Sequence, residues 1–276
     1  MKKKALKITA FVVAIMLVIG LGIFASALVG NPVSHMLCKN KAKAYLSEKY
    51  ADTDFVLEKV SYSFKTGNYY AYIQSPGSAD SHFSLTLDMG GNLIYDSYTQ
   101  MVTSGENTAR RLNQAYRELT DSVFESPAFP FTSEIAYGDL EFVSKAYTQN
   151  KDVPSYAIIQ EDLELDGLYN IPELGAKAGH LIVYIDDETV SIERAAEIML
   201  ELKDLMDQAG APFYAINFVL EYAQTETEDA RQEGRVEALQ FLYSDIYEEG
   251  MIQRVKAANE AAMEYYSAAD AEKNMQ

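Results

Sequence analysis

The sequence contains no tryptophan, only one cysteine (Cys38) and only seven prolines in 276 residues. A single cysteine excludes an internal disulfide and a thiolate metal cluster, so the folded part must be stable on its hydrophobic core alone. Apolar residues make up 48% and charged residues 23% of the chain. These values are typical of folded proteins and exclude a disordered acidic tail, a collagen and a multi-span transporter. The length allows two small domains.

Basic residues are scarce beyond the N-terminal part of the chain. Residues 1–50 hold eight of the 23 basic residues and one of the 41 acidic residues, which leaves 15 basic against 40 acidic residues over residues 51–276. Such a surface repels phosphate backbones, and no cluster of Lys and Arg beyond residue 43 offsets this repulsion. The charge pattern therefore excludes nucleic-acid binding.

One long apolar run lies near the N-terminus, where no charged residue occurs from Ile8 to Gly30. This length predicts a single membrane-spanning helix in contact with the lipid bilayer, since about 20 apolar residues cross a bilayer. Four lysines within the first seven residues predict a cytoplasmic N-terminus and place residues 35–276 outside the cytoplasm. A secretory signal cleaved after Ala27 is the alternative, and it predicts the same location for the body of the protein.

Residues 35–150 are expected to form a first α+β domain. Asn31 and Pro32 predict a break after the apolar run and the start of a linker. Helical spacing of apolar residues indicates a helix over residues 39–50, and a second helix is expected after Thr108. Period-two alternation predicts an antiparallel meander of four strands, with turns at Gly67 and at Gly90-Gly91. These strands are Phe55–Phe64, Tyr69–Ser75, His82–Met89 and Asn92–Tyr98.

Residues 151–276 are expected to form a second α+β domain. A strand over His180–Ile185 precedes a helix over Ser191–Ala209, which Ser191 can cap and Gly210 can end. Two further strands, over residues 213–222 and 236–243, and a helix over residues 248–267 follow. The predicted fold class is therefore α+β, with residues 1–34 as cytoplasmic tip, transmembrane helix and break, followed by two small α+β domains.

One stretch of the second half matches the spacing of a calcium-binding EF-hand loop. Oxygen-bearing ligands at alternate positions can converge on one ion, a glycine turns the chain, and a final glutamate can bind through both oxygens. The matching positions are Asp162, Glu164, Asp166, Gly167, Leu168, Asn170 and Glu173. Glu164 is longer than the usual ligand, and Pro172 interrupts the exiting helix, so a solvated turn followed by a helix starting at Pro172 is the alternative. No metal site is assigned.

Tyrosine is abundant, with 20 residues. Several of these tyrosines fall in predicted strands, where aromatic rings pack well across the pleat. They are Tyr69, Tyr70, Tyr72, Tyr95 and Tyr98. Packing within the core and on the sheet is one interpretation, and a platform that binds a glycan or a peptide is the other.

The sequence contains no recognisable catalytic motif. His35, His82 and His180 are scattered, and none has a second metal-ligand type at helical spacing. Neither a nucleophile elbow nor a zinc-protease motif nor a phosphate-binding glycine loop is present. We therefore expect a protein that is not an enzyme and binds no cofactor.

The sequence resembles the YfjL-like family of membrane-anchored proteins of Gram-positive bacteria, which have no assigned function. The segments that carry the resemblance are residues 30–34 (GNPVS), 44–50 (AYLSEKY), 60–65 (VSYSFK), 95–98 (YDSY) and 107–112 (NTARRL). The resemblance implies two extracytoplasmic domains and supplies no catalytic residue.

The functional hypothesis is a binding or regulatory module of the cell envelope, whose partner is an envelope protein or peptide. Two alternatives stay open. One is an envelope enzyme with paired carboxylates, of the glycan hydrolase type, which the abundance of acidic residues allows. The other is a peptidase inhibitor similar to small PepSY or cystatin-like modules, which share the order of one helix followed by antiparallel strands.

Overall fold

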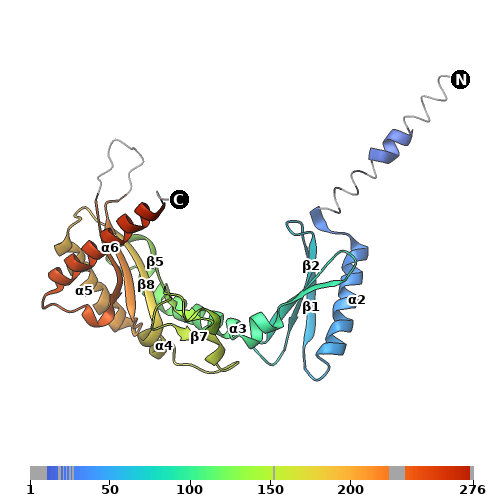
Figure 1. Cartoon of the computed structure of the whole chain (residues 1–276), viewed down its shortest axis with the longest axis horizontal. Helices are drawn as coiled ribbons and strands as arrows, with labels where there is room; N and C mark the ends of the chain where they lie inside the picture. Colours follow the sequence, from blue (N-terminus) through green and yellow to red (C-terminus); the bar gives the residue numbers. More distant parts are fainter. Residues whose placement is uncertain are drawn as a thin grey trace, which may run out of the picture. The chain divides into compact units, whose positions relative to one another are not determined.

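The computed structural model describes residues 11–17, 20, 22, 24, 26, 28–151, 153–223 and 234–273. These residues divide into two compact units (Figure 1). Unit 1 comprises the chain up to Thr108 together with Glu164–Asp166, and unit 2 comprises Ala109–Leu163 and the chain from Gly167 onward.

Unit 1 consists of a long helix packed on a four-stranded sheet. The helix is α2 (Pro32–Lys49), and the strands are β1 (Val56–Ser63), β2 (Asn68–Gln74), β3 (His82–Leu87) and β4 (Leu93–Asp96). The strands lie in chain order, and each pairs antiparallel with the next. Within unit 1, Figure 1 shows α2 along one face of this sheet. The predicted antiparallel meander is therefore confirmed.

The core of unit 1 lies between α2 and the alternating apolar residues of the strands. Cys38, Ala42 and Leu46, spaced four apart on α2, are buried with every second residue of β2 and β3. The Cys38 Sγ donates to the Asp88 carbonyl at 3.3 Å. Burial, and then the charge of Asp88, raise the pKa of Cys38, so the thiol stays protonated.

Helix α2 begins earlier than the spacing of apolar residues indicates. The Asn31 side chain accepts a hydrogen bond from the Ser34 backbone N–H at 2.8 Å, and Pro32 occupies the first turn. Proline is tolerated there because the first-turn N–H groups have no intrahelical acceptor. The residues expected to begin a linker therefore form the capped first turn of the helix.

Unit 2 contains a mixed four-stranded sheet in the order β10-β9-β8-β5. Its strands are β5 (Thr132–Leu140), β8 (Gly179–Asp186), β9 (Ala215–Glu221) and β10 (Arg235–Leu242). Helix α5 (Ile192–Ala209) connects β8 to β9, which pair parallel, whereas the two outer pairs are antiparallel. Helices α3 (Glu106–Phe124), α4 (Ile171–Ala178) and α6 (Met251–Lys273) and the short parallel strands β6 (Phe142–Val143) and β7 (Ile158–Ile159) complete the fold.

The predicted elements of the C-terminal half agree with unit 2. Ser191 caps α5, accepting from the Arg194 backbone N–H at 3.1 Å. Gly210 ends the helix with φ of 65°, a left-handed conformation that glycine adopts without steric cost. The core lies between α5, α6 and alternate residues of the strands, including Leu181, Val183 and Phe218.

Two predictions differ from the structure. The expected boundary near Asn150 falls inside unit 2, because β5 pairs with β8 from about forty residues away, a contact that local periodicity does not show.

The transmembrane part of the predicted fold class is wrong: no helix of the described residues is both long and apolar enough to cross a membrane. Part of the Ile8 to Gly30 run lies outside the described residues. The fold class is α+β.

Candidate functional site

The sheet of unit 1 has a second face, opposite α2, on which polar and aromatic side chains form cross-strand rows. Directly paired residues of antiparallel strands point to the same side of the sheet. One row crosses all four strands, through Ser61, Tyr70, Thr86 and Tyr95. The next row contains Lys59, Tyr72 and Ser84. We call these seven residues the open face.

The open face is partly accessible to solvent, and its side chains contact one another. Tyr95 is 49% exposed and Tyr72 is 38% exposed. The Lys59 Nζ lies 5.0 Å from the centre of the Tyr72 ring, a distance at which the cation is attracted to the ring. The Tyr95 hydroxyl donates to the Gln100 side chain at 2.9 Å. The open face thus offers aromatic rings together with hydroxyl groups.

The tyrosines that the sequence groups together separate into two environments. Tyr69 is buried at 1% exposure, and Tyr98 packs against Tyr50, Phe55 and Phe83 on the α2 side. Tyr70, Tyr72 and Tyr95 belong to the open face instead. Alternation along β2 was the signal that separates Tyr69 from its neighbours, because successive strand residues point to opposite sides.

A partly buried carboxylate fixes β4 to α2 beneath the open face. The Asp96 Oδ2 accepts hydrogen bonds from the Lys49 Nζ at 2.7 Å, the Tyr45 hydroxyl at 2.8 Å and the Tyr50 hydroxyl at 2.9 Å. Burial acts to raise the pKa of Asp96, but these donors and the Tyr98 backbone N–H together lower it. The network holds the strand that carries Tyr95 in register.

The residues that match the EF-hand spacing do not all belong to one unit. Glu164 and Asp166 pack with unit 1, whereas Asp162, Leu168, Asn170 and Glu173 belong to unit 2. Among the described residues, no group of three or more His, Cys, Asp or Glu side chains could hold a metal ion.

Several oxygens of this stretch have other partners. The Asp162 carboxylate pairs with Lys145 at 2.7 Å. The Asp166 Oδ1 accepts from the Asp80 backbone N–H, and the Asp166 N–H donates to the Asp80 Oδ2, each at 3.0 Å. Asn170 caps α4, and its Nδ2 donates to the Glu173 Oε1 at 2.9 Å, while Leu168 is 99% exposed. The geometry is that of a turn followed by a capped helix with proline in its first turn.

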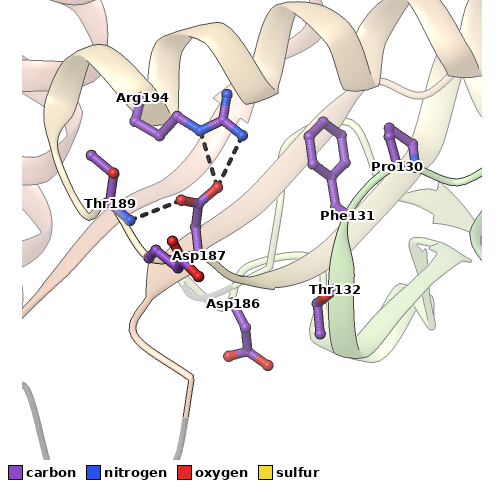
Figure 2. A pocket seen from close by; sticks show the side chains of 8 residues that line it. Pro130, Phe131, Thr132, Asp186, Asp187, Thr189 and Arg194 are labelled. Carbon is purple, nitrogen blue, oxygen red and sulfur yellow. Dashed lines mark hydrogen bonds and ion pairs between the residues drawn. The ribbon is translucent and has the colours of Figure 1, made fainter.

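A cavity of about 470 Å³ lies at the carboxyl end of β8 and the start of α5 (Figure 2). Arg194 donates from Nε and Nη2 to the Asp187 Oδ2, at 3.0 and 2.9 Å. Burial acts to raise the pKa of Asp187, but the Thr189 backbone N–H and Arg194 lower it overall. Burial, and then the charge of Glu134, raise the pKa of Asp186.

Opposite pKa shifts of two carboxyl groups are what an acid and base pair requires, but these two groups do not face each other. Asp186 and Asp187 are consecutive, and consecutive positions at a strand end point apart. Figure 2 shows the Asp186 side chain extending away from Asp187 and Arg194. Asp186 and Asp187 are therefore not a facing pair of carboxylates.

The most buried histidine has a single hydrogen-bond partner. The His180 Nδ1 lies 2.6 Å from the Glu141 Oε1, and the His180 side chain is 6% exposed. Its Nε2 has no hydrogen-bond partner among the described residues. A catalytic triad needs a nucleophile at that nitrogen, so this pair lacks the third member.

Comparison with known proteins identifies the family. Residues 2–97 match the YfjL-like N-terminal domain, and residues 115–256 match the YfjL-like C-terminal domain. The chain belongs to the YfjL-like family. The open face lies within the N-terminal match, and the cavity beside Asp187 lies within the C-terminal match of this YfjL-like protein. A Gram-positive origin stays a prediction.

Two further comparisons indicate no function for the chain. None of the curated proteins compared with this YfjL-like chain matches it. A crystal structure of a DUF5037 family protein from Ruminococcus gnavus ATCC 29149 aligns with 80% of this chain and 98% of its own length, at 16% identity and a TM-score of 0.24. That alignment supports no conclusion about fold or function.

Proposed function

We propose that this protein is a binding module of the cell envelope rather than an enzyme, and that the open face is its binding surface. The observation that carries the proposal is the pair of cross-strand rows with Tyr70, Tyr72 and Tyr95 on the side of the sheet opposite α2. Tyrosine supplies a large, rigid and amphipathic contact area at low cost in conformational entropy, which is why it is enriched in binding surfaces.

The sheet also provides a rigid support for these side chains. The opposite face packs on α2, and the aromatic cluster around Tyr50 and Phe83 fills the space between them. Binding sites on strands hold their geometry better than sites on loops. A ligand would therefore meet a surface that is already formed, which lowers the entropic cost of binding.

Site-specific photocrosslinking in cells tests this proposal. A photoreactive amino acid replaces Thr86, at the centre of the open face, or Ser47, a similarly small residue on the exposed side of α2. We expect adducts with an envelope component from position 86 and not from position 47, and a loss of these adducts on adding Tyr72→Ala. Equal adducts from both positions, or none from position 86, would contradict a binding role for the open face.

We also propose that residues 35–276 lie outside the cytoplasm, which the basic residues and the apolar run at the N-terminus favour under the alternative of a cleaved secretory signal. Protease added to intact cells is expected to degrade the protein. If the protein is protected in intact cells and degraded only in lysed cells, this location is wrong.

A further inference from the structure

The open face has a distinct chemistry: none of the seven residues that define it is acidic, and Lys59 is the one cation among them. It also lacks large aliphatic side chains, since its members are tyrosines, serines, a threonine and a lysine. Protein–protein interface cores are by contrast depleted in serine and rich in apolar contact.

The rings and hydroxyls of the open face follow a regular spacing. Tyr70 and Tyr95 lie in one row with β3 between them, which places their backbones about 10 Å apart because neighbouring strands are about 4.8 Å apart. Thr86 lies between the two rings and Ser61 at the end of the row, so hydroxyl groups alternate with aromatic rings across the sheet.

We infer that the open face binds a neutral, extended glycan chain lying across the strands, an inference that rests on the proposed binding function. A pyranose ring has one face of C–H bonds that stacks on an aromatic ring, and its hydroxyl groups hydrogen-bond to serine, threonine and tyrosine hydroxyls. The spacing of Tyr70 and Tyr95 is comparable to the length of a disaccharide, so two rings can contact sugars of one chain with Thr86 between them.

The charge and the geometry favour this ligand over others. A polyanion binds through several cations, and Lys59 is the one cation among the seven residues of the open face. An extended peptide gains affinity from main-chain hydrogen bonds at the edge of a sheet, not from contacts across its face. A neutral chain of sugars requires neither a charge partner nor a free sheet edge.

Calorimetric titration of the purified full-length protein with chitohexaose, a neutral N-acetylglucosamine hexamer, tests the inference, with heparin as the polyanion. We expect binding of chitohexaose and none of heparin. Tyr70→Ala and Tyr95→Ala should each weaken binding about tenfold, in the range of the contribution of one stacked ring. Tyr95→Phe, which keeps the ring, should retain most of the affinity. Tyr147→Ala, at an exposed tyrosine of unit 2, is the matched control and should change nothing.

Each other outcome has a definite meaning, provided that circular dichroism shows the variants folded. Chitohexaose binding that the two Tyr→Ala variants leave unchanged would place the sugar elsewhere and overturn the inference. No sugar binding, with specific adducts still formed from position 86, would overturn the glycan while the proposed binding function stands. The absence of both would overturn the two proposals together.

Discussion

Tyr116 is predicted to be the side chain on which the packing of unit 2 depends most. Its ring is fully buried between α3, β5 and α4, and its hydroxyl donates to the Pro212 carbonyl at 3.0 Å. Three glycines make room for the ring. A Cβ added at Gly175 would lie 2.5 Å from the Tyr116 Cε2, one at Gly138 would lie 3.0 Å from the Cε1, and one at Gly179 would overlap the hydroxyl.

Removing the ring should leave a cavity that the rigid backbone cannot fill. Truncation of a buried Phe or Trp to Ala costs about 3–5 kcal/mol, so Tyr116→Ala should lose a similar amount of the free energy of unfolding. Tyr116→Phe keeps the ring and loses only the hydrogen bond to Pro212, which is worth about 1 kcal/mol. The ratio of the two losses separates packing from hydrogen bonding.

Urea unfolding followed by circular dichroism measures both losses. With an m-value of about 2 kcal/mol/M, the midpoint of the Tyr116→Ala variant should fall by about 2 M and that of Tyr116→Phe by about 0.5 M. Tyr147→Ala, at a tyrosine that is 65% exposed, should leave the midpoint nearly unchanged. The reasoning is refuted if Tyr116→Ala loses no more than Tyr147→Ala, or if Tyr116→Phe loses as much as Tyr116→Ala.

Three further predictions concern charged groups. Asp96→Asn should cost about 1–3 kcal/mol at pH 7 in urea unfolding. The pKa of Asp96 is lower in the folded protein than in the unfolded chain. The Asp96 carboxylate therefore stabilises the fold at pH values above its unfolded pKa, and this stabilisation is lost as pH falls through its folded pKa. The variant should therefore lose less stability than the parent as pH falls below about 4, and equal acid sensitivity of the two proteins would contradict this. In Arg194→Ala the Asp187 carboxylate loses its guanidinium partner, so carbon NMR titration should show a higher pKa for Asp187. An unchanged pKa would show that the Thr189 backbone N–H alone keeps it low. Calcium and magnesium at equal concentration should raise the melting temperature alike, through screening of the acidic surface; a shift specific to calcium that Glu173→Gln abolishes would count against this.

Local periodicity was sufficient to predict most helices and strands. Alternation along residues 55–98 predicted the four-stranded meander, and the Ser191 and Gly210 signals predicted both ends of α5. These features depend on neighbours two to four residues apart, so they can be read from a short stretch of sequence. The resemblance to the YfjL-like family was likewise visible in short segments, and it is confirmed.

Pairing between distant segments was decided only by the tertiary structure. Strand β5 pairs with β8, which lies far along the chain, and residues 109–163 therefore belong to unit 2. The residues that match the EF-hand spacing are likewise divided between the two units, because the unit to which each residue belongs depends on contacts with distant parts of the chain. Asp166 exchanges hydrogen bonds with Asp80, 86 residues away, and no local pattern encodes such a contact.

The open face follows in part from local alternation in the sequence and in part from the tertiary structure. Alternation along β2 by itself assigned Tyr70 and Tyr72 to one side of the strand and Tyr69 to the other. Only the folded unit decided which side α2 covers, and only the register of β3 with β4 placed Tyr95 in the row of Tyr70. The side of a strand that stays accessible depends on where an amphipathic helix docks, and docking follows from the burial of apolar surface over the whole unit rather than from any single segment.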